Sequence, residues 1–235
     1  MILRISIFYI ITFIFTIVIG GTQEALGVSS NLAILPQLAP GVAALLMVLI
    51  FRREGFRFNF KEIFPQRLIS AIIVPAGAAV IIFIFYFYIF KLAPPAKLSS
   101  VSWAMIFWMP LGALGEELGW RGYLQKVLSE RYSPLFGAVI TGILWAAWHV
   151  GIYQNGSSYF IFFVLLIVSY SVVMGFICGS GFNVLIAAVF HFMINFTNLF
   201  SLNSIGSLEF MVISSLVWAV PAGFILFREG LYKAK

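Results

Sequence analysis

Two adjacent glutamates stand in an otherwise apolar stretch of this chain, in the segment LGALGEELGWRGYLQKVL (residues 111–128). Charged side chains inside a membrane-crossing helix are expensive and rare, so these need a reason. Glu117 and Arg121 are four residues apart with the acid first, which is the favourable order for an ion pair on a helix. A buried charge is tolerated when it has such a partner. We therefore predict that Glu117 and Arg121 form a structural pair.

Glu116 is the candidate for acid–base chemistry, because the helix offers it no counter-charge. Successive helical residues are rotated by about 100°, so Glu116 and Glu117 face different ways. A low-dielectric site favours the neutral form of a carboxyl group, which suits a general base that works near neutral pH. The alternative is a protonated glutamate that only forms a hydrogen bond to another helix.

Small residues accompany Glu116 along the helix. On its expected face lie Gly112, Ala113 and Gly119, which we expect to leave space beside the carboxyl group, and Trp120, which forms an aromatic wall. Gly115 and Gly119 also form a small-xxx-small pair, which allows the backbones of two membrane helices to approach closely. The pair predicts that a neighbouring helix packs against this segment.

Both histidines of the chain fall in apolar stretches. His149 closes LWAAWHVG one turn after Trp145, and His191 opens HFMIN one turn before Asn195. One such histidine is often only a packing residue, but polar groups within a membrane tend to face each other inside the bundle. We predict that four side chains surround one water-filled cavity at a central or slightly cytoplasmic depth: Glu116, His149, His191 and Asn195.

These side chains leave two kinds of hydrolysis open. Two histidines and one carboxylate, here His149, His191 and Glu116, can hold a catalytic zinc ion with an open position for water. The chain has no HExxH motif, however, and Glu116 as a ligand would no longer be the base unless Glu117 replaced it. Hydrolysis in a water cavity needs no further residue, so a mechanism without metal or other cofactor is favoured.

The composition describes the elements that must position these residues. Hydrophobic residues make up 62% of the 235 positions and charged residues 9%, whereas soluble domains carry about 25% charged residues. The single cysteine, Cys178, excludes an internal disulfide and a multi-thiolate metal site. We predict one integral-membrane domain over 1–235, all-α. Its bundle has about eight spans of about 20 residues: 3–20, 32–51, 68–90, 101–128, 134–152, 159–178, 184–201 and 208–227.

Basic residues set the orientation of the bundle. Cytoplasmic loops are enriched in Lys and Arg, and a cytoplasmic N-terminus leaves only Lys91 and Lys97 in outer loops. The inner loops and termini then hold Arg4, Arg52, Arg53, Arg57, Lys61, Arg67, Lys126, Arg131, Arg228, Lys233 and Lys235. Both termini are therefore predicted to be cytoplasmic. The net charge of +6 follows from this topology, and we expect the lipid bilayer rather than nucleic acid as a partner.

Three motifs together resemble a known family. EELGWR (116–121) resembles the EExxxR motif of the CAAX-processing endopeptidase and bacteriocin-immunity proteins, the CPBP or Abi family, which includes the Ras-converting type of prenyl-protein endopeptidase. WAAWH (145–149) is similar to its motif of an aromatic residue followed by histidine, with Trp145 where phenylalanine is commoner. HFMIN (191–195) is similar to its HxxxN motif. Order and spacing agree over residues 101–200.

The resemblance implies an intramembrane endopeptidase of the cell membrane. In the mechanism that it implies, Glu116 and His149 activate water, while His191 and Asn195 stabilise the oxyanion. Glu117, Arg121 and Trp145 would support these groups. The implied substrate is a membrane-associated peptide or lipidated protein, such as a prenylated CAAX protein, cut near the boundary between membrane and cytoplasm.

Two other classes of function remain open. The first is a non-catalytic membrane protein that binds a peptide, such as a bacteriocin-immunity factor. The second is a transporter in which buried Glu and His relay protons. Transporters often consist of paired halves with interrupted helices, and the sequence shows no such internal repeat.

Overall fold

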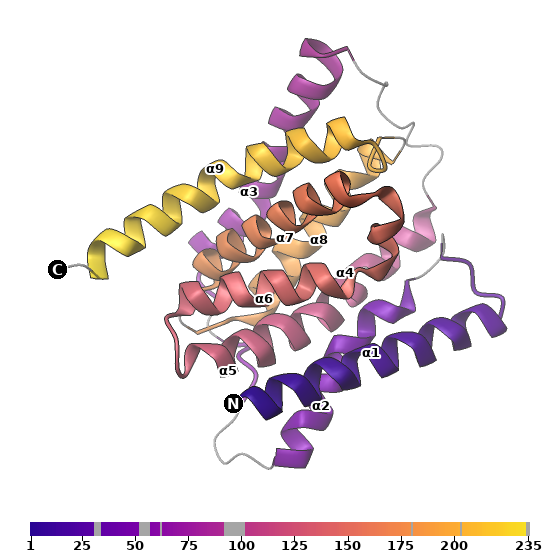
Figure 1. The fold of residues 1–235 in the computed structure, drawn as a ribbon, viewed down its shortest axis with the longest axis vertical. Coiled ribbons are helices and arrows are strands. Elements are labelled where there is room, and N and C mark those ends of the chain that lie inside the picture. The colour runs from indigo at the N-terminus through magenta and orange to yellow at the C-terminus, as the bar shows by residue number, and fades with distance from the viewer. Residues whose placement is uncertain are drawn as a thin grey trace.

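Apolar helices joined by short loops make up the fold, as predicted (Figure 1). The computed structural model describes residues 1–30, 34–51, 57–61, 63–91, 102–179, 181–202 and 204–233, with side chains up to residue 229. The α-helices are α1 (Ile2–Ala25), α2 (Ala39–Phe51), α3 (Pro65–Phe83), α4 (Trp103–Glu117), α5 (Lys126–Ser129), α6 (Pro134–Trp148), α7 (Ser157–Cys178), α8 (Val184–Asn198) and α9 (Leu208–Lys233).

Short helical turns of other kinds extend several of these helices. The 3₁₀ segments are η1 (Leu35–Leu38), η5 (Val150–Asn155) and η6 (Leu199–Ser201). The π-helical segments are η2 (Ile84–Ile89) and η4 (Leu118–Gln125). Because η4 continues α4 into α5, the residues from Trp103 to Ser129 form one continuous helix. It carries both glutamates of the first motif.

Five helices in the described part of the chain are long and apolar enough to cross a membrane. They are Ile2–Ala25, Pro65–Ile89, Ser157–Cys178, Val184–Ser201 and Leu208–Glu229, and shorter apolar helices cover Leu35–Phe51 and Pro134–Trp148. Each predicted span coincides with one or more helical segments, except at single residues such as Ile34, Phe90, Ser102 and His149, and residues 32, 33 and 101 are outside the described ranges. The total of about eight crossings and the cytoplasmic placement of both termini stay predictions.

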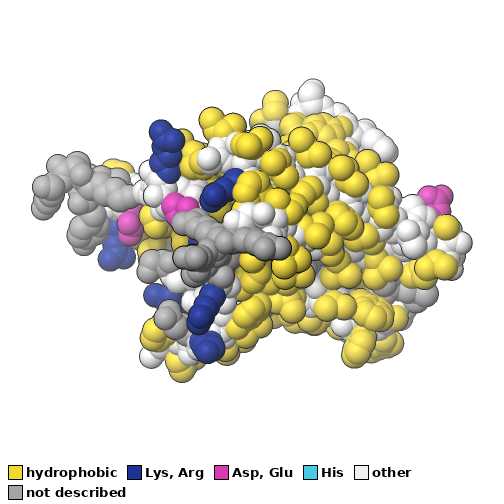
Figure 2. Space-filling view, turned by 90° about the horizontal axis from the view of Figure 1, so that it is seen from below, with side chains coloured by type: hydrophobic (Ala, Val, Ile, Leu, Met, Phe, Trp, Pro, Cys, Tyr) yellow, Lys and Arg dark blue, Asp and Glu magenta, His cyan; other side chains and the backbone are white. Residues whose placement is uncertain are grey.

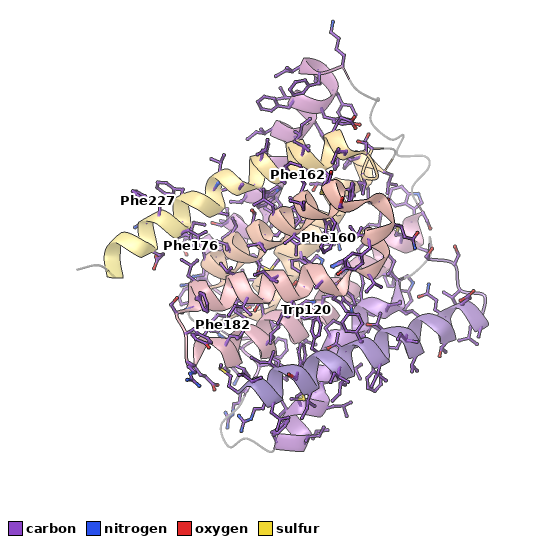
Figure 3. All side chains as sticks on the ribbon, in the orientation of Figure 1. Trp120, Phe160, Phe162, Phe176, Phe182 and Phe227 are labelled. Carbon is purple, nitrogen blue, oxygen red and sulfur yellow. The ribbon has the colours of Figure 1, made fainter. Side chains whose placement is uncertain are left out.

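The helices pack around a central pair, α7 and α8. Helix α7 packs against both α6 and α9, while α3 and α4 each pack against α8. Helices α1 and α9 lie on opposite sides of the bundle (Figure 1). The ring of Trp120, labelled in Figure 3, contacts Phe8 of α1 and Trp148 of α6 at centroid distances of 5.7 and 5.8 Å. Aromatic contacts therefore join α1 to the helix that carries the glutamates.

Basic side chains gather at one end of a broad hydrophobic surface (Figure 2). We call this the basic end. It is formed by the start of α1, the loop before α3, the α5–α6 turn, the α7–α8 turn and the end of α9, with Arg4, Arg57, Lys61, Arg67, Lys126, Arg131 and Arg228. Arg52, Arg53, Lys97 and Lys235 lie outside the described residues. The apolar surface beside this end fits contact with lipid.

Glycines bring η1 and α2 against the glutamate-bearing helix. A Cβ atom added to Gly115 would lie 2.9 Å from Cα of Leu38, and one added to Gly119 would lie 2.6 Å from the carbonyl oxygen of Pro40. The predicted close approach of a helix at Gly115 and Gly119 is thus confirmed. The space beside Gly112 and Gly119, however, is filled by Gln37 and Pro40 and does not open beside Glu116.

Replacing Gly119 by alanine should destabilise the fold by about 1–3 kcal/mol, because the added methyl group meets backbone atoms that cannot move aside freely. Thermal unfolding in detergent measures the change. Gly77→Ala is the matched control: this exposed helical glycine has nothing within 4 Å of an added Cβ, so helix propensity should stabilise the variant by up to about 1 kcal/mol. Equal melting temperatures for the two variants would contradict the packing argument.

Candidate active site

Glu116 is buried inside the bundle rather than turned to lipid. Glu116 is 1% exposed, and its Oε2 accepts a hydrogen bond of 2.7 Å from the indole Nε1 of Trp145. This bond joins α4 to α6. The Glu116 carboxylate is also close enough to interact electrostatically with both His149 and His191.

Glu117 faces a different set of partners, as the helical rotation predicts. Nη1 of Arg121 lies 3.1 Å from its Oε2 and 3.2 Å from its Oε1, and both side chains are fully buried. The predicted structural pair is confirmed. Oε1 of Glu117 also lies 2.7 Å from Nδ1 of His191, a contact that the sequence did not reveal. Glu117 therefore holds a predicted catalytic side chain as well as its counter-charge.

His149 lies at the end of α6 rather than within a helix. The α-helix stops at Trp148, and His149 has φ −79° and ψ 62° before η5 begins. The predicted span 134–152 is therefore wrong in its last four residues as an α-helix. Nδ1 of His149 lies 2.8 Å from the carbonyl oxygen of Trp145. Because a carbonyl only accepts, Nδ1 carries the hydrogen, and Nε2 is the basic nitrogen of the neutral ring.

His191 is oriented in the same way by a different acceptor. An ionised carboxylate only accepts hydrogen bonds, so Nδ1 of His191 donates to Glu117 and Nε2 remains for chemistry. A carboxylate on one imidazole nitrogen stabilises the imidazolium form of the ring. His191 can therefore donate from Nε2 when it is doubly protonated.

Trp145 connects the groups of the site. Its indole N–H binds Glu116, its carbonyl oxygen binds His149, and its ring lies 5.1 Å from that of His191. The guanidinium carbon of Arg121 lies 4.4 Å from the centre of the same ring, a favourable cation–π contact. The sequence predicts Trp145 only as a supporting residue, yet it contacts both predicted water-activating groups.

A cavity of about 150 Å³ lies next to these groups. Three of the four predicted residues line it, namely His149, His191 and Asn195, together with Trp145. Glu116 is not a lining residue and reaches the cavity through its bond to the Trp145 indole. The prediction that all four surround the cavity is corrected to this extent, because the indole N–H holds the carboxylate.

The cavity also contains polar groups that the sequence analysis did not select. Asn198 lines it and interacts with the hydroxyl group of Tyr170, while the hydroxyl of Tyr159 donates to the carbonyl oxygen of Ile205 at 2.6 Å. Asn198 lies two helical turns after His191 on α8, so helical spacing is a signal that could have found it. The tyrosines lie in an α7 sequence that is apolar on all sides and offers no such signal.

The donor set does not fit a zinc site. Among the described residues, no group of three or more His, Cys, Asp or Glu side chains is arranged to hold a metal ion. Glu116 is bound by an indole N–H and does not line the cavity that the two histidines line. The bonds at Nδ1 do not exclude a metal, because metal-binding histidines usually have one ring nitrogen engaged in this way. The predicted ligands Glu116, His149 and His191 therefore do not form a three-ligand centre.

Comparison with known proteins agrees with the motifs. A family model described as type II CAAX prenyl endopeptidase Rce1-like matches residues 98–197. Lysostaphin resistance protein A of Staphylococcus epidermidis is 25% identical in an alignment of 208 positions that covers 84% of this chain and 54% of that protein. The Staphylococcus aureus protein of the same name is 24% identical in an alignment of 236 positions that covers 93% of this chain and 55% of that protein.

The chain thus spans about half the length of the curated relatives that it matches. The matched region 98–197 contains all three motifs, from Glu116 to Asn195. Its helices place those motifs around one buried site in an integral membrane protein. Through this region the chain is similar to the family described as type II CAAX prenyl endopeptidase Rce1-like.

Proposed function

We propose that this protein is an intramembrane endopeptidase that hydrolyses a peptide bond in a membrane-associated protein or peptide. The observation that carries the proposal is the shared hydrogen-bonding pattern of His149 and His191. Both line one cavity, and both have Nδ1 held by an acceptor, so that Nε2 is the nitrogen available for chemistry. The match of residues 98–197 to an endopeptidase family model agrees with this arrangement.

Water activation is assigned to Glu116 and His149. The neutral His149 ring accepts a proton at Nε2, and the nearby Glu116 carboxylate stabilises the charge that this creates. Water then adds to the peptide carbonyl carbon, and the proton passes to the leaving amine when the tetrahedral intermediate collapses. Trp145 fixes the relative position of the two groups because it bonds to both.

Oxyanion stabilisation is assigned to His191 and Asn195, one helical turn apart on α8. His191 donates from Nε2 as the imidazolium that Glu117 stabilises, and Asn195 donates from its amide. Donors that are already in place where negative charge develops typically contribute about 3–4 kcal/mol to a transition state. This assignment needs no metal ion or other cofactor.

Cleavage of a lipidated peptide library tests the proposal directly. Purified wild-type protein in detergent should cut a subset of peptides, and His191→Ala should cut the same peptides far more slowly. The library includes prenylated CAAX peptides and acylated peptides, so the product pattern identifies the lipid requirement. If folded wild-type protein cut none of the peptides, the result would contradict the endopeptidase proposal.

Chelation should leave this activity unchanged, because the proposed mechanism activates water with Glu116 and His149 and assigns no step to a metal ion. Turnover is measured after dialysis against EDTA and again after addition of zinc, with bound metal quantified in parallel. Loss of turnover on dialysis with recovery on zinc addition would show that hydrolysis depends on metal.

Trp145→Phe should lower turnover by about 10- to 100-fold while keeping the aromatic wall. The substitution deletes one hydrogen bond to a charged group, which contributes about 1.5–3 kcal/mol, and retains the backbone carbonyl that binds His149. The matched control is Trp103→Phe, which alters an exposed tryptophan at the start of the same glutamate-bearing helix. Unchanged turnover in Trp145→Phe would remove Trp145 from the mechanism.

A second candidate is a binding protein without catalysis. The name of the relatives, lysostaphin resistance protein A, favours a role in resistance that could rest on binding a membrane peptide. An enzyme loses its cellular phenotype with Glu116→Gln, whereas a binding protein keeps it.

A further inference from the structure

We propose that the cavity opens on the membrane face opposite the basic end, so that the substrate is cut at the extracytoplasmic side. The inference rests on the proposed endopeptidase function and names the substrate class for that same site. It would be a membrane-anchored protein or peptide whose scissile bond lies in an outer juxtamembrane segment. This differs from the cytoplasmic location that the family resemblance implies.

The direction of the helices places the cavity away from the basic end. Helix α6 begins at Pro134 beside Arg131 of that end, and the cavity is lined only by its last turn, at Trp145, and by His149 and Ile152 beyond it. Helix α7 returns toward the basic end, and its lining residues run from Tyr159 near its start to Tyr170 just past its midpoint.

Helices α8 and α9 repeat this pattern. Helix α8 leaves the basic end at Val184, and its lining residues begin at His191 and end at Asn198. The remaining walls come from Ile205 in the α8–α9 connection and from the start of α9 at Phe210 and Met211. The lining residues therefore run from the middle of these helices, at His191 and Tyr170, to the ends remote from the basic end, and the predicted central or slightly cytoplasmic depth stays a prediction.

The basic end is closed by hydrogen bonds between its loops. The side-chain amide of Asn59 donates to the carbonyl oxygen of Gly181 at 3.0 Å, and the backbone carbonyl oxygen of Asn59 accepts from the backbone N–H of Val184 at 3.0 Å. Arg67 donates to the carbonyl oxygen of Cys178 at 2.7 Å.

Between these loops and the site, the helices bury large side chains such as Leu124, Leu128, Met174 and Phe190. A cavity of about 560 Å³ at the basic end shares no lining residue with the catalytic cavity. Access from the basic end is therefore blocked by packed side chains in the described part of the chain.

The size and walls of the cavity describe what enters it. A water molecule occupies about 30 Å³ of liquid, so 150 Å³ corresponds to about five waters or one apolar side chain. Apolar side chains, among them Ile152, Phe163 and Met211, form much of the remaining wall. We expect an extended substrate that inserts one apolar residue and places the adjoining carbonyl near His191.

Sidedness follows from charge. Lys and Arg collect on the cytoplasmic side of membrane proteins, and most of the described basic side chains collect at one end of this bundle (Figure 2), whereas Lys91 follows η2 at the far end of α3 and Arg121 is buried in the site. The cavity lies toward the other end, so its mouth faces outward.

Cysteine labelling in intact cells tests the sidedness without reference to activity. Ser158→Cys introduces an exposed thiol at the mouth end and Gln66→Cys one at the basic end, while the native Cys178 is fully buried. A membrane-impermeant maleimide should label Ser158→Cys in intact cells and Gln66→Cys only after permeabilisation. The unmodified chain should stay unlabelled in both conditions. The reverse pattern would overturn the inference.

Two single-span reporters then test the substrate class. Each carries the same peptide, taken from the library cleavage, on either the outer or the inner side of the membrane. Wild-type protein should cut the outer reporter, and Glu116→Gln should cut neither. Cleavage of the inner reporter alone would overturn the inference while upholding the peptidase. Labelling as expected, with neither reporter nor library cut, would instead sink the endopeptidase function and with it the proposed substrate.

Discussion

Glu116→Gln lowers peptide cleavage by about 10²- to 10⁴-fold while the protein stays folded. The substitution removes the carboxylate that assists water activation, and general acid–base groups contribute about this much to rate. Glutamine keeps a side-chain oxygen that can accept the Trp145 N–H bond, so the packing around α4 is retained. Turnover of a library peptide and the melting temperature of the same preparation are measured together.

The control for this experiment is Glu24→Gln, which changes an exposed glutamate at the end of α1. It should cut at the wild-type rate. Equal turnover in Glu116→Gln and wild type would end the assignment of Glu116 as the base, whatever the fate of the other residues.

Arg121→Met destabilises the protein by about 3–5 kcal/mol. Both partners of the Glu117–Arg121 pair are fully buried, and loss of one partner leaves an uncompensated charge in a low-dielectric interior. Unfolding in detergent, followed by thermal or chemical denaturation, measures the effect. Methionine approximates the length of the arginine stem, so the lost charge dominates over lost volume.

A double variant separates charge from packing. Glu117→Gln combined with Arg121→Met removes both charges, and it should recover a large part of the stability lost in Arg121→Met alone. Because His191 then loses its anionic partner, the recovered protein should remain poorly active. A double variant as unstable as the single one would show that the guanidinium acts through packing on Trp145 rather than through its charge.

Several features of the site could be predicted from residue spacing alone. The pairing of Glu117 with Arg121 and the different direction of Glu116 follow from the turn of one helix, and the structure shows both. The close approach at Gly115 and Gly119 follows from the absence of side chains there. The gathering of His149, His191 and Asn195 follows from the poor solubility of polar groups in lipid.

Contacts between helices could not be predicted in this way. The period of a single helix shows which residues share a face, but not how that face is rotated toward a neighbour. The bond from Glu117 to His191 depends on the packing of α4 against α8, and the indole bond to Glu116 depends on α6. The π-helical register of η4 and the end of α6 at Trp148 likewise depend on the surrounding bundle.

The hydrogen bond between Glu117 and His191 also connects α4 to α8 at the site. A substrate residue too large for the cavity would have to push these helices apart. This movement would break the hydrogen bond between the His191 imidazole and the Glu117 carboxylate. The ring would then lose the charge that lets it donate. Peptides with such a residue would therefore bind without being cut, so selection would act on the catalytic step rather than on binding.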